Sequence, residues 1–142
     1  MMTRRDFLAS AAAQTLTTAK RPNVIVILTD QHRFDALAAH GNGIIRTPNL
    51  DRLAAQSANF SSAYVQSPVC VPSRVTLLTG RYPHSHKNRV NYTPCDPSEV
   101  FLQRILREAG YQTGSVGKLH YYPPTADYAR STGFDKVLLD DG

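Results

Sequence analysis

Runs of apolar residues alternate with polar stretches along this chain, and their spacing predicts strands and helices in turn. The run at 23–29, NVIVILT, is apolar and β-branched at consecutive positions, which is typical of a strand buried on both faces of a parallel sheet. The stretches at 59–65 and 111–116 also predict strands. Polar residues follow the first and last of these runs, at strand ends where α/β sheets bind ligands.

Three segments predict helices. One covers 47–55, with Thr47 as its N-cap and Pro48 at the first helical position. A second begins near Pro72 and ends at Gly80, with valine and leucine between them. This alternation indicates an α/β fold, a mostly parallel sheet flanked by helices, and 142 residues are enough for one modest core.

The third helix has the clearest start and stop signals. Asp96 is its expected cap, Pro97 takes the first helical position, and Glu99 completes a capping box. Gly110 is the natural stop. Its apolar face is expected to consist of Phe101, Leu102, Ile105, Leu106 and Ala109.

The sequence of residues 1–20 predicts an export signal. Arg4 and Arg5 precede a short alanine-rich stretch, a pattern that resembles a twin-arginine signal. The alternative is a frayed, charged helix. On the first interpretation the mature chain begins near Lys20 or Arg21 and the protein is periplasmic or secreted. The stretch is too short and too polar for a stable membrane span.

Composition narrows the class of protein. The formal charge is +5, without a lysine and arginine run interleaved with aromatics, so we interpret it as attraction for anions and expect no nucleic-acid partner. Two cysteines are too few for a disulfide scaffold.

One of these cysteines, Cys70, lies where the second predicted helix begins. Unpaired N–H groups and the helix dipole favour negative charge there, on a thiolate or on an anionic substrate. Arg74, one turn later, offers a bidentate fork suited to sulfate or phosphate oxygens. Taken alone, the same pattern also fits a packed cysteine with a surface arginine.

The longer stretch of sequence around Cys70 favours a catalytic role for this residue. Residues 70–74 read CVPSR and are followed by LLTGR at 77–81, which resembles the signature of the sulfatase family of the alkaline-phosphatase superfamily. The resemblance implies that a formylglycine-generating enzyme converts Cys70 to formylglycine (3-oxoalanine), reading Pro72 and Arg74 as its label. One hydroxyl of the hydrated aldehyde attacks sulfur, and deprotonation of the other later expels sulfate. Arg74 then steadies the hydrate.

A second segment supports the resemblance. Residues 30–35, DQHRFD, are similar to the family's D-D-x-R-x-D segment. The resemblance implies that Asp30 and Gln31 bind Ca²⁺ (or Mg²⁺), which prefers such oxygen ligands, and that the modified Cys70 contacts the same ion. Gln31 departs from the usual second aspartate, and it keeps open a phosphonate monoester or phosphodiester hydrolase of the same superfamily. The plain alternative is a solvated strand end.

A third segment, residues 110–120, reads GYQTGSVGKLH and resembles the family's second signature, with Leu119 in place of a more usual aromatic. By this resemblance Lys118 binds sulfate oxygens, and His120 hydrogen-bonds the hydrate and helps to remove its proton. Each alone would fit a surface lysine or a loop histidine. Three matches in the family's order favour the catalytic interpretation.

Other candidates are weaker. His84 and His86 could suggest a metal pair, but alternate loop residues are more often solvated. Cys95 fits a turn or core cysteine. The resemblance covers 21–142, only the opening part of a catalytic domain, and further metal ligands and a substrate-binding lysine and histidine lie downstream in the family. We therefore expect a truncated chain with little activity alone. The expected substrate of the enzyme is a sulfate ester of a small molecule or glycan. The alternative hypothesis is an inactive anion-binding fragment.

Overall fold

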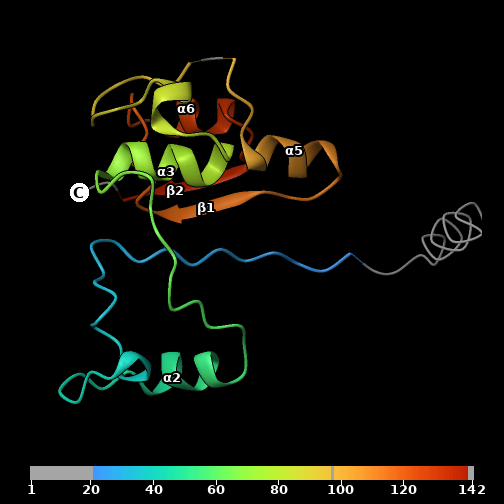
Figure 1. Cartoon of the computed structure of the whole chain (residues 1–142). Helices are drawn as coiled ribbons and strands as arrows, with labels where there is room; N and C mark the ends of the chain where they lie inside the picture. Colours follow the sequence, from blue (N-terminus) through green and yellow to red (C-terminus); the bar gives the residue numbers. More distant parts are fainter. Residues whose placement is uncertain (1–20, 97, 141–142) are drawn as a thin grey trace, which may run out of the picture. The chain divides into compact units, whose positions relative to one another are not determined.

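The computed structural model describes residues 21–96 and 98–140, which divide into two units, one ending at Asn59 and one beginning at Phe60 (Figure 1). The expected signal segment therefore lies outside the described residues. The first unit contains the 3-10 helix η2 (Ala38–His40) and α2 (Pro48–Ala55). The second contains α3 (Cys70–Thr79), α4 (Pro83–His86), α5 (Leu102–Glu108), β1 (Gly114–Gly117), α6 (Ala126–Ser131) and β2 (Lys136–Leu139). None of the described helices has the length and apolar character needed to cross a membrane.

The first unit is held by polar side chains rather than by a core. Helix α2 begins at Pro48 as predicted, but the hydroxyl of Thr47 does not cap it and donates instead to Asp51 Oδ1 at 2.9 Å. The same two side chains accept the backbone N–H groups of Ala38 and Ala39. This pair therefore ties η2 to α2, in a unit where none of the described residues is buried.

Two predicted strands are absent from the described residues. Residues 23–29 and 59–65 have no regular secondary structure, and Val24 to Leu28 are 53–85% exposed. A strand needs a hydrogen-bonded neighbour as well as β-branched side chains. No segment of the described chain pairs with either run, so the prediction of strands there is wrong for this structure.

The second unit confirms the α/β class in part. Strands β1 and β2 pair in parallel, with Gly114 opposite Lys136 and Gly117 opposite Leu139. Helix α6 lies between them in the sequence, as a parallel pair requires. The hydroxyl of Thr125 caps this helix by accepting the Tyr128 N–H at 3.2 Å. Strand β1 begins three residues later than the predicted Tyr111, since residues 111–113 make no ladder.

Thr113 and Asp135 join the segments that precede the two strands. Asp135 Oδ2 accepts the backbone N–H of Thr113 at 2.8 Å, and the Thr113 hydroxyl donates to the Gly133 carbonyl at 2.8 Å. The hydrogen bond from the Thr113 N–H, above all, holds the pKa of Asp135 below its ordinary value. These bonds fix the register of β1 against β2.

The helix predicted from Asp96 begins later than expected, at Leu102, with Phe101 as its N-cap. Asp96 instead accepts the N–H and the hydroxyl of Ser98, which closes a local turn. Glu99 is buried and pairs with Arg81, so its carboxylate is not available for a capping box. The predicted stop is confirmed, because Gly110 has φ +89° directly after the helix.

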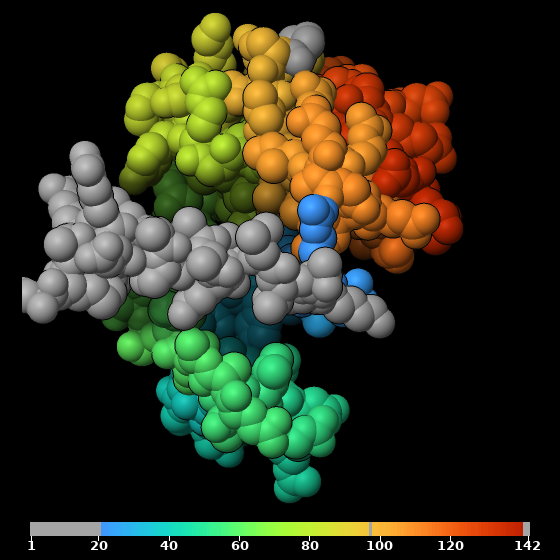
Figure 2. Space-filling view, turned by 90° about the vertical axis from the view of Figure 1, so that its right-hand side faces the viewer, coloured from blue at the N-terminus to red at the C-terminus, as the bar shows by residue number. Residues whose placement is uncertain are grey.

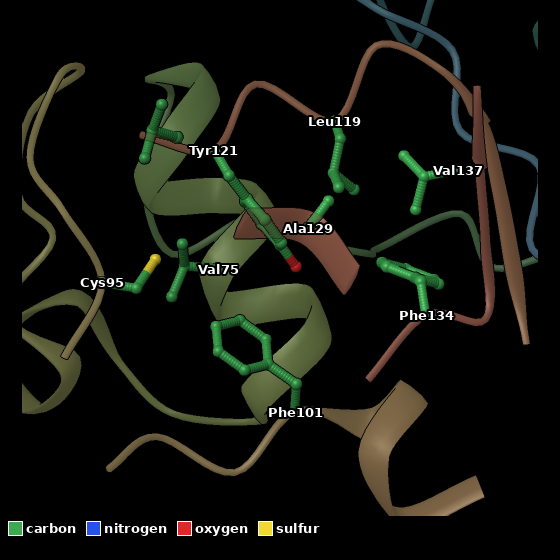
Figure 3. Close-up of a cluster of buried hydrophobic side chains, with 9 residues drawn as sticks. Val75, Cys95, Phe101, Leu119, Tyr121, Ala129, Phe134 and Val137 are labelled. Atoms are coloured by element: carbon green, nitrogen blue, oxygen red, sulfur yellow. The ribbon is translucent and has the colours of Figure 1, made fainter. Parts of the chain in front are cut away.

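The core of the second unit lies between α3, α6 and the strand pair (Figure 3). Helix α3 spans the predicted segment and ends at Gly80, whose φ of +67° suits glycine. The buried apolar residues are Val71, Val75, Cys95, Phe101, Leu119, Tyr121, Ala129, Phe134 and Val137. Cys95 is thus a core cysteine, as one of the two predicted possibilities had it.

Replacing Gly133 should weaken this core markedly. Gly133 has φ +122°, and a Cβ there would lie 2.6 Å from the backbone N of Arg104, which cannot move without displacing α5. We expect Gly133→Ala to lower the free energy of unfolding by about 3 kcal/mol or more. Gly80→Ala is the matched control, since Gly80 also has positive φ but open space around it, and it should cost about 1 kcal/mol. Urea unfolding curves giving equal losses would contradict the packing assignment.

Candidate functional site

Cys70 is the first residue of α3 and is half-buried. The backbone N–H of Ser73 donates to the Val69 carbonyl at 3.0 Å, which closes the first turn. The N–H of Val71 donates to Asn91 Oδ1 at 3.1 Å, across twenty residues of sequence. The predicted placement of Cys70 at a helix N-terminus is therefore found. Asn91 is a neighbour that the sequence did not reveal, because an asparagine in a loop carries no signal of its distant partner.

Arg74 lies one turn further along α3 and is 8% exposed. Its Nη1 donates to the main-chain carbonyl of Lys118 at 2.5 Å. The structure thus brings the two predicted anion-binding residues together from segments 44 residues apart. The guanidinium is planar and has five N–H donors, and the bond to this carbonyl helps to fix its orientation.

Lys118 and His120 lie in the segment that follows β1. Between and beyond them, Leu119 and Tyr121 are 6% and 2% exposed and project into the core (Figure 3). Lys118 and His120 are only half-buried. His120 has φ +56°, a conformation that non-glycine residues adopt rarely. The buried side chains therefore anchor this segment, and a left-handed turn at His120 sets the direction of its ring.

A closed loop over residues 87–94 lies beside this site. Asn88 is fully buried, and its Nδ2 donates to the carbonyls of Thr93 at 2.7 Å and Pro94 at 3.2 Å. These two bonds tie the start of the loop to its end. Asn91, which contacts the N-terminus of α3, belongs to the same loop. We call this element the 87–94 loop.

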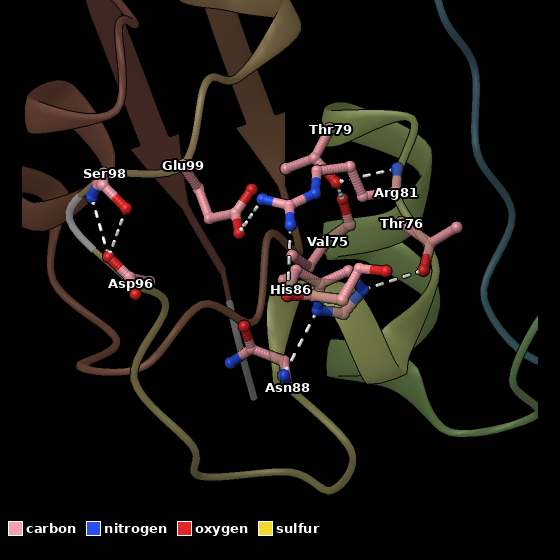
Figure 4. Close-up of polar contacts among 10 residues, drawn as sticks. Val75, Thr76, Thr79, Arg81, His86, Asn88, Asp96, Ser98 and Glu99 are labelled. Carbon is pink, nitrogen blue, oxygen red and sulfur yellow. Dashed lines mark hydrogen bonds and ion pairs between the residues drawn. The ribbon is translucent and has the colours of Figure 1, made fainter.

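His86 and His84 do not form a metal pair. His86 is 1% exposed, and its Nδ1 accepts the backbone N–H of Asn88 at 3.2 Å (Figure 4). The neutral ring then carries its proton on Nε2, which donates to Thr76 Oγ1 at 3.0 Å. Desolvation by burial lowers the pKa of His86 below the ordinary 6.5. His84, by contrast, is exposed and stacks on Tyr82 with ring centroids 5.6 Å apart.

An ion pair fixes the other end of α3. Arg81 Nη1 lies 2.6 Å from Oε1 of Glu99, whose side chain is 3% exposed (Figure 4). Arg81 Nη2 also donates to the Ser85 carbonyl at 3.2 Å. The arginine of the LLTGR string therefore has a structural partner, and it joins the ends of α3 and α4 to the segment before α5.

Asp30 and Gln31 belong to the first unit and are both exposed. Gln31 has φ +41°, so the chain turns sharply there. Arg33 pairs with Asp35, Nη2 to Oδ2 at 2.5 Å, rather than with either of the two residues. Among residues 21–96 and 98–140, no three His, Cys, Asp or Glu side chains gather as a ready metal site. The oxygen donors of Asp30 and Gln31 suit a hard cation, and they make up part of the six to eight ligands that Ca²⁺ takes.

The four predicted catalytic residues Cys70, Arg74, Lys118 and His120 all lie in the second unit. A half-buried helix N-terminus, a guanidinium and an ammonium are each groups suited to an anion with several oxygens.

Comparisons with known proteins agree with this chemistry. The family model described as Sulfatase matches residues 22–141. An arylsulfatase of Clostridium perfringens is 40% identical over 125 residues, covering 86% of this chain and 25% of the relative. An N-acetylglucosamine-6-O-sulfatase of Bacteroides thetaiotaomicron is 35% identical over 113 residues, covering 80% and 20%. The chain thus spans about a fifth to a quarter of the length of these relatives.

Solved structures match as well. One, a complex with its substrate D-glucosamine-2-N,6-O-disulfate, has a TM-score of 0.74 at 33% identity and covers 83% of this chain and 23% of that one. The phosphonate monoester hydrolase of Agrobacterium radiobacter has a TM-score of 0.73 at 30% identity, covering 84% and 26%. These matches confirm the predicted fold class.

The buried histidine predicts a dependence of stability on pH. Because His86 has a lower pKa folded than unfolded, the unfolded chain binds more protons below pH 6.5. The contribution of His86 is therefore fully present above about pH 6.5 and is lost as the pH falls toward its folded pKa. We expect His86→Gln to flatten this acid slope in unfolding measurements between pH 7 and 5. His84→Gln, the control, should leave the slope intact, and an NMR titration of His86 at 6.5 or above would contradict the prediction.

Proposed function

The chain belongs to the sulfatase family, and we propose that it carries the nucleophile and the anion-binding side of a sulfuric ester hydrolase site. The observation that supports this most directly is the bond from Arg74 to the Lys118 carbonyl, which joins the helix bearing Cys70 to the segment bearing Lys118 and His120. Those are the residues for which the sequence motifs imply catalytic roles.

Cys70 is the proposed nucleophile position. Formylglycine made from Cys70 would supply a hydrated aldehyde, an oxygen nucleophile that a thiol is not. Its place at the first residue of α3, half-buried and beside the Val71–Asn91 hydrogen bond, supports this assignment. The helix N-terminus favours the negative charge that develops on sulfate oxygens.

The remaining side chains have separate tasks. Lys118 contributes a positive charge for the sulfate oxygens, and Arg74 steadies the modified Cys70 from the buried side of α3. His120 accepts or returns a proton at the position of the nucleophile. The left-handed turn at His120 and the burial of Leu119 and Tyr121 support this role, because they anchor the backbone that carries its ring.

Asp30 and Gln31 are the proposed metal ligands of this chain. Their carboxylate and amide oxygens fit Ca²⁺ or Mg²⁺, which would offset the charge of a bound sulfate. This pair alone leaves most of the coordination shell to other groups.

A sulfated sugar is the substrate class we propose. One relative is named as acting on N-acetylglucosamine 6-O-sulfate groups, and one structural neighbour holds D-glucosamine-2-N,6-O-disulfate. We also propose export through the twin-arginine segment and modification of Cys70 before export.

A phosphonate monoester hydrolase is the second candidate. It is favoured by Gln31 in place of an aspartate and by the match to the hydrolase of Agrobacterium radiobacter. Rates of the full-length protein on a sulfate monoester and on a phosphonate monoester, compared at equal concentration, separate the two candidates. A non-catalytic anion-binding role predicts turnover of neither.

The nucleophile assignment predicts a sharp difference between the two cysteines. In the full-length protein co-expressed with a formylglycine-generating enzyme, Cys70→Ala should abolish turnover of 4-nitrophenyl sulfate. Cys95→Ala should keep most of it, since Cys95 is buried in the core of the second unit. Peptide mass spectrometry should find the aldehyde at Cys70 alone. An unmodified thiol at Cys70 in an active protein would refute the mechanism.

The metal assignment predicts a change in calcium dependence. Chelation should reduce turnover, and added Ca²⁺ should restore it. Asp30→Asn should raise the Ca²⁺ concentration for half-maximal activity by at least about tenfold, because it removes a charged ligand. Asp127→Asn makes the same chemical change at a side chain that is 95% exposed and pairs only with Arg130, and it should have no effect. Equal Ca²⁺ requirements in both variants would remove Asp30 from the site.

A further inference from the structure

Two exposed tyrosines lie beside His120 and have no assigned role. The rings of Tyr92 and Tyr122 meet edge to face, with centroids 6.2 Å apart and planes at 87°. Tyr92 also meets the His120 ring edge to face at 6.4 Å. Tyr92 is 71% exposed and Tyr122 38% exposed. We call these two residues the tyrosine pair.

The tyrosine pair is connected along the chain to the segments that hold Cys70 and His120. Tyr92 directly follows Asn91, whose side chain accepts the N–H of the residue after Cys70. Tyr122 follows the buried Tyr121, which anchors its segment in the core. The pair is therefore connected to both sides of the site through residues that are themselves fixed.

This arrangement differs from the core aromatics of the same unit. Phe101 and Tyr121, with ring centroids 5.5 Å apart, are both almost fully buried, and their contact contributes to packing. Tyr92 has φ +65°, an unfavourable conformation, in a loop closed by Asn88, and the result is an exposed ring. Strained backbone conformations of this kind cluster at ligand-binding sites, which favours a binding role for the ring of Tyr92.

We propose that the tyrosine pair binds the pyranose ring of the sugar whose sulfate is removed, on the leaving-group side of His120. This inference rests on the proposed function and adds a subsite to it. Edge-to-face rings offer flat apolar faces for the C–H surface of a sugar, and phenol hydroxyls can bond its hydroxyl groups. Lys87 and Arg89, both exposed on the 87–94 loop, suit a sugar that carries further anionic groups.

The test separates binding of the ring from binding of sulfate. The full-length protein and its Tyr92→Ala, Tyr122→Ala and Tyr92→Phe variants are assayed on glucosamine 6-O-sulfate and on methyl sulfate, which has no ring. Inhibition by glucosamine and by inorganic sulfate is measured in parallel. Tyr82→Ala is the control, since Tyr82 is also exposed but stacks on His84.

Each alanine variant should raise KM for the sugar sulfate and the inhibition constant of glucosamine by about tenfold, the size of a lost ring contact. Turnover of methyl sulfate and inhibition by sulfate should stay as in the wild type and in Tyr82→Ala. Tyr92→Phe should keep most of the sugar affinity.

Three results would overturn the inference. The first is no change in either variant, the second is an equal loss of affinity for glucosamine and sulfate, and the third is hydrolysis of 4-nitrophenyl sulfate with no sulfated pyranose accepted. Absence of turnover on every sulfate ester by the correctly modified wild type would instead refute the proposed function. In that case, glucosamine 6-O-sulfate that still shifts the NMR signals of Tyr92 and Tyr122 supports the subsite, and no shift refutes it.

Discussion

The hydrogen bond from Arg74 to the Lys118 carbonyl is the contact on which the site depends. It joins the second turn of α3 to the segment after β1, across 44 residues, and it is made by a side chain that is 8% exposed. If the two segments separated within the fold, the buried guanidinium would lose this partner, and an unpaired buried charge costs free energy. This cost, as well as the hydrogen bond itself, keeps the segments together. Cys70 lies at one end of this connection, and Lys118 and His120 at the other.

The hydrophobic core also holds α3 and the segment after β1 together. Val71 and Val75 of α3 are buried in one cluster with Leu119 and Tyr121, the residues interleaved with Lys118 and His120. In both segments, apolar side chains that pack in the core thus alternate with polar side chains that have proposed catalytic roles. Around this cluster, Arg81 with Glu99 and His86 with Thr76 fix α3 through buried polar contacts, whose geometry is more directional than that of apolar packing.

Local signals in the sequence predicted what is decided locally. Helix α3, its stop at Gly80 and the place of Cys70 follow from composition and spacing, and they are confirmed. The capping box at Asp96 failed because Glu99 has a distant partner, Arg81. The strand at 23–29 failed because pairing depends on a neighbouring strand, and no segment of the described chain is paired with it. Asn91 and Tyr92 were missed for the same reason, since their contacts span twenty or more residues.

The two units differ in what holds them, and this difference bears on how a site is completed. The second unit has its own core, so the anion-binding residues are positioned before any ligand arrives. The first has no buried residue among those described and depends on bonds such as that between Thr47 and Asp51. Structure held by exposed hydrogen bonds opens at low free-energy cost. The proposed ligands Asp30 and Gln31 lie in the unit without a core, whereas Arg74 and Lys118 lie in the unit that has one.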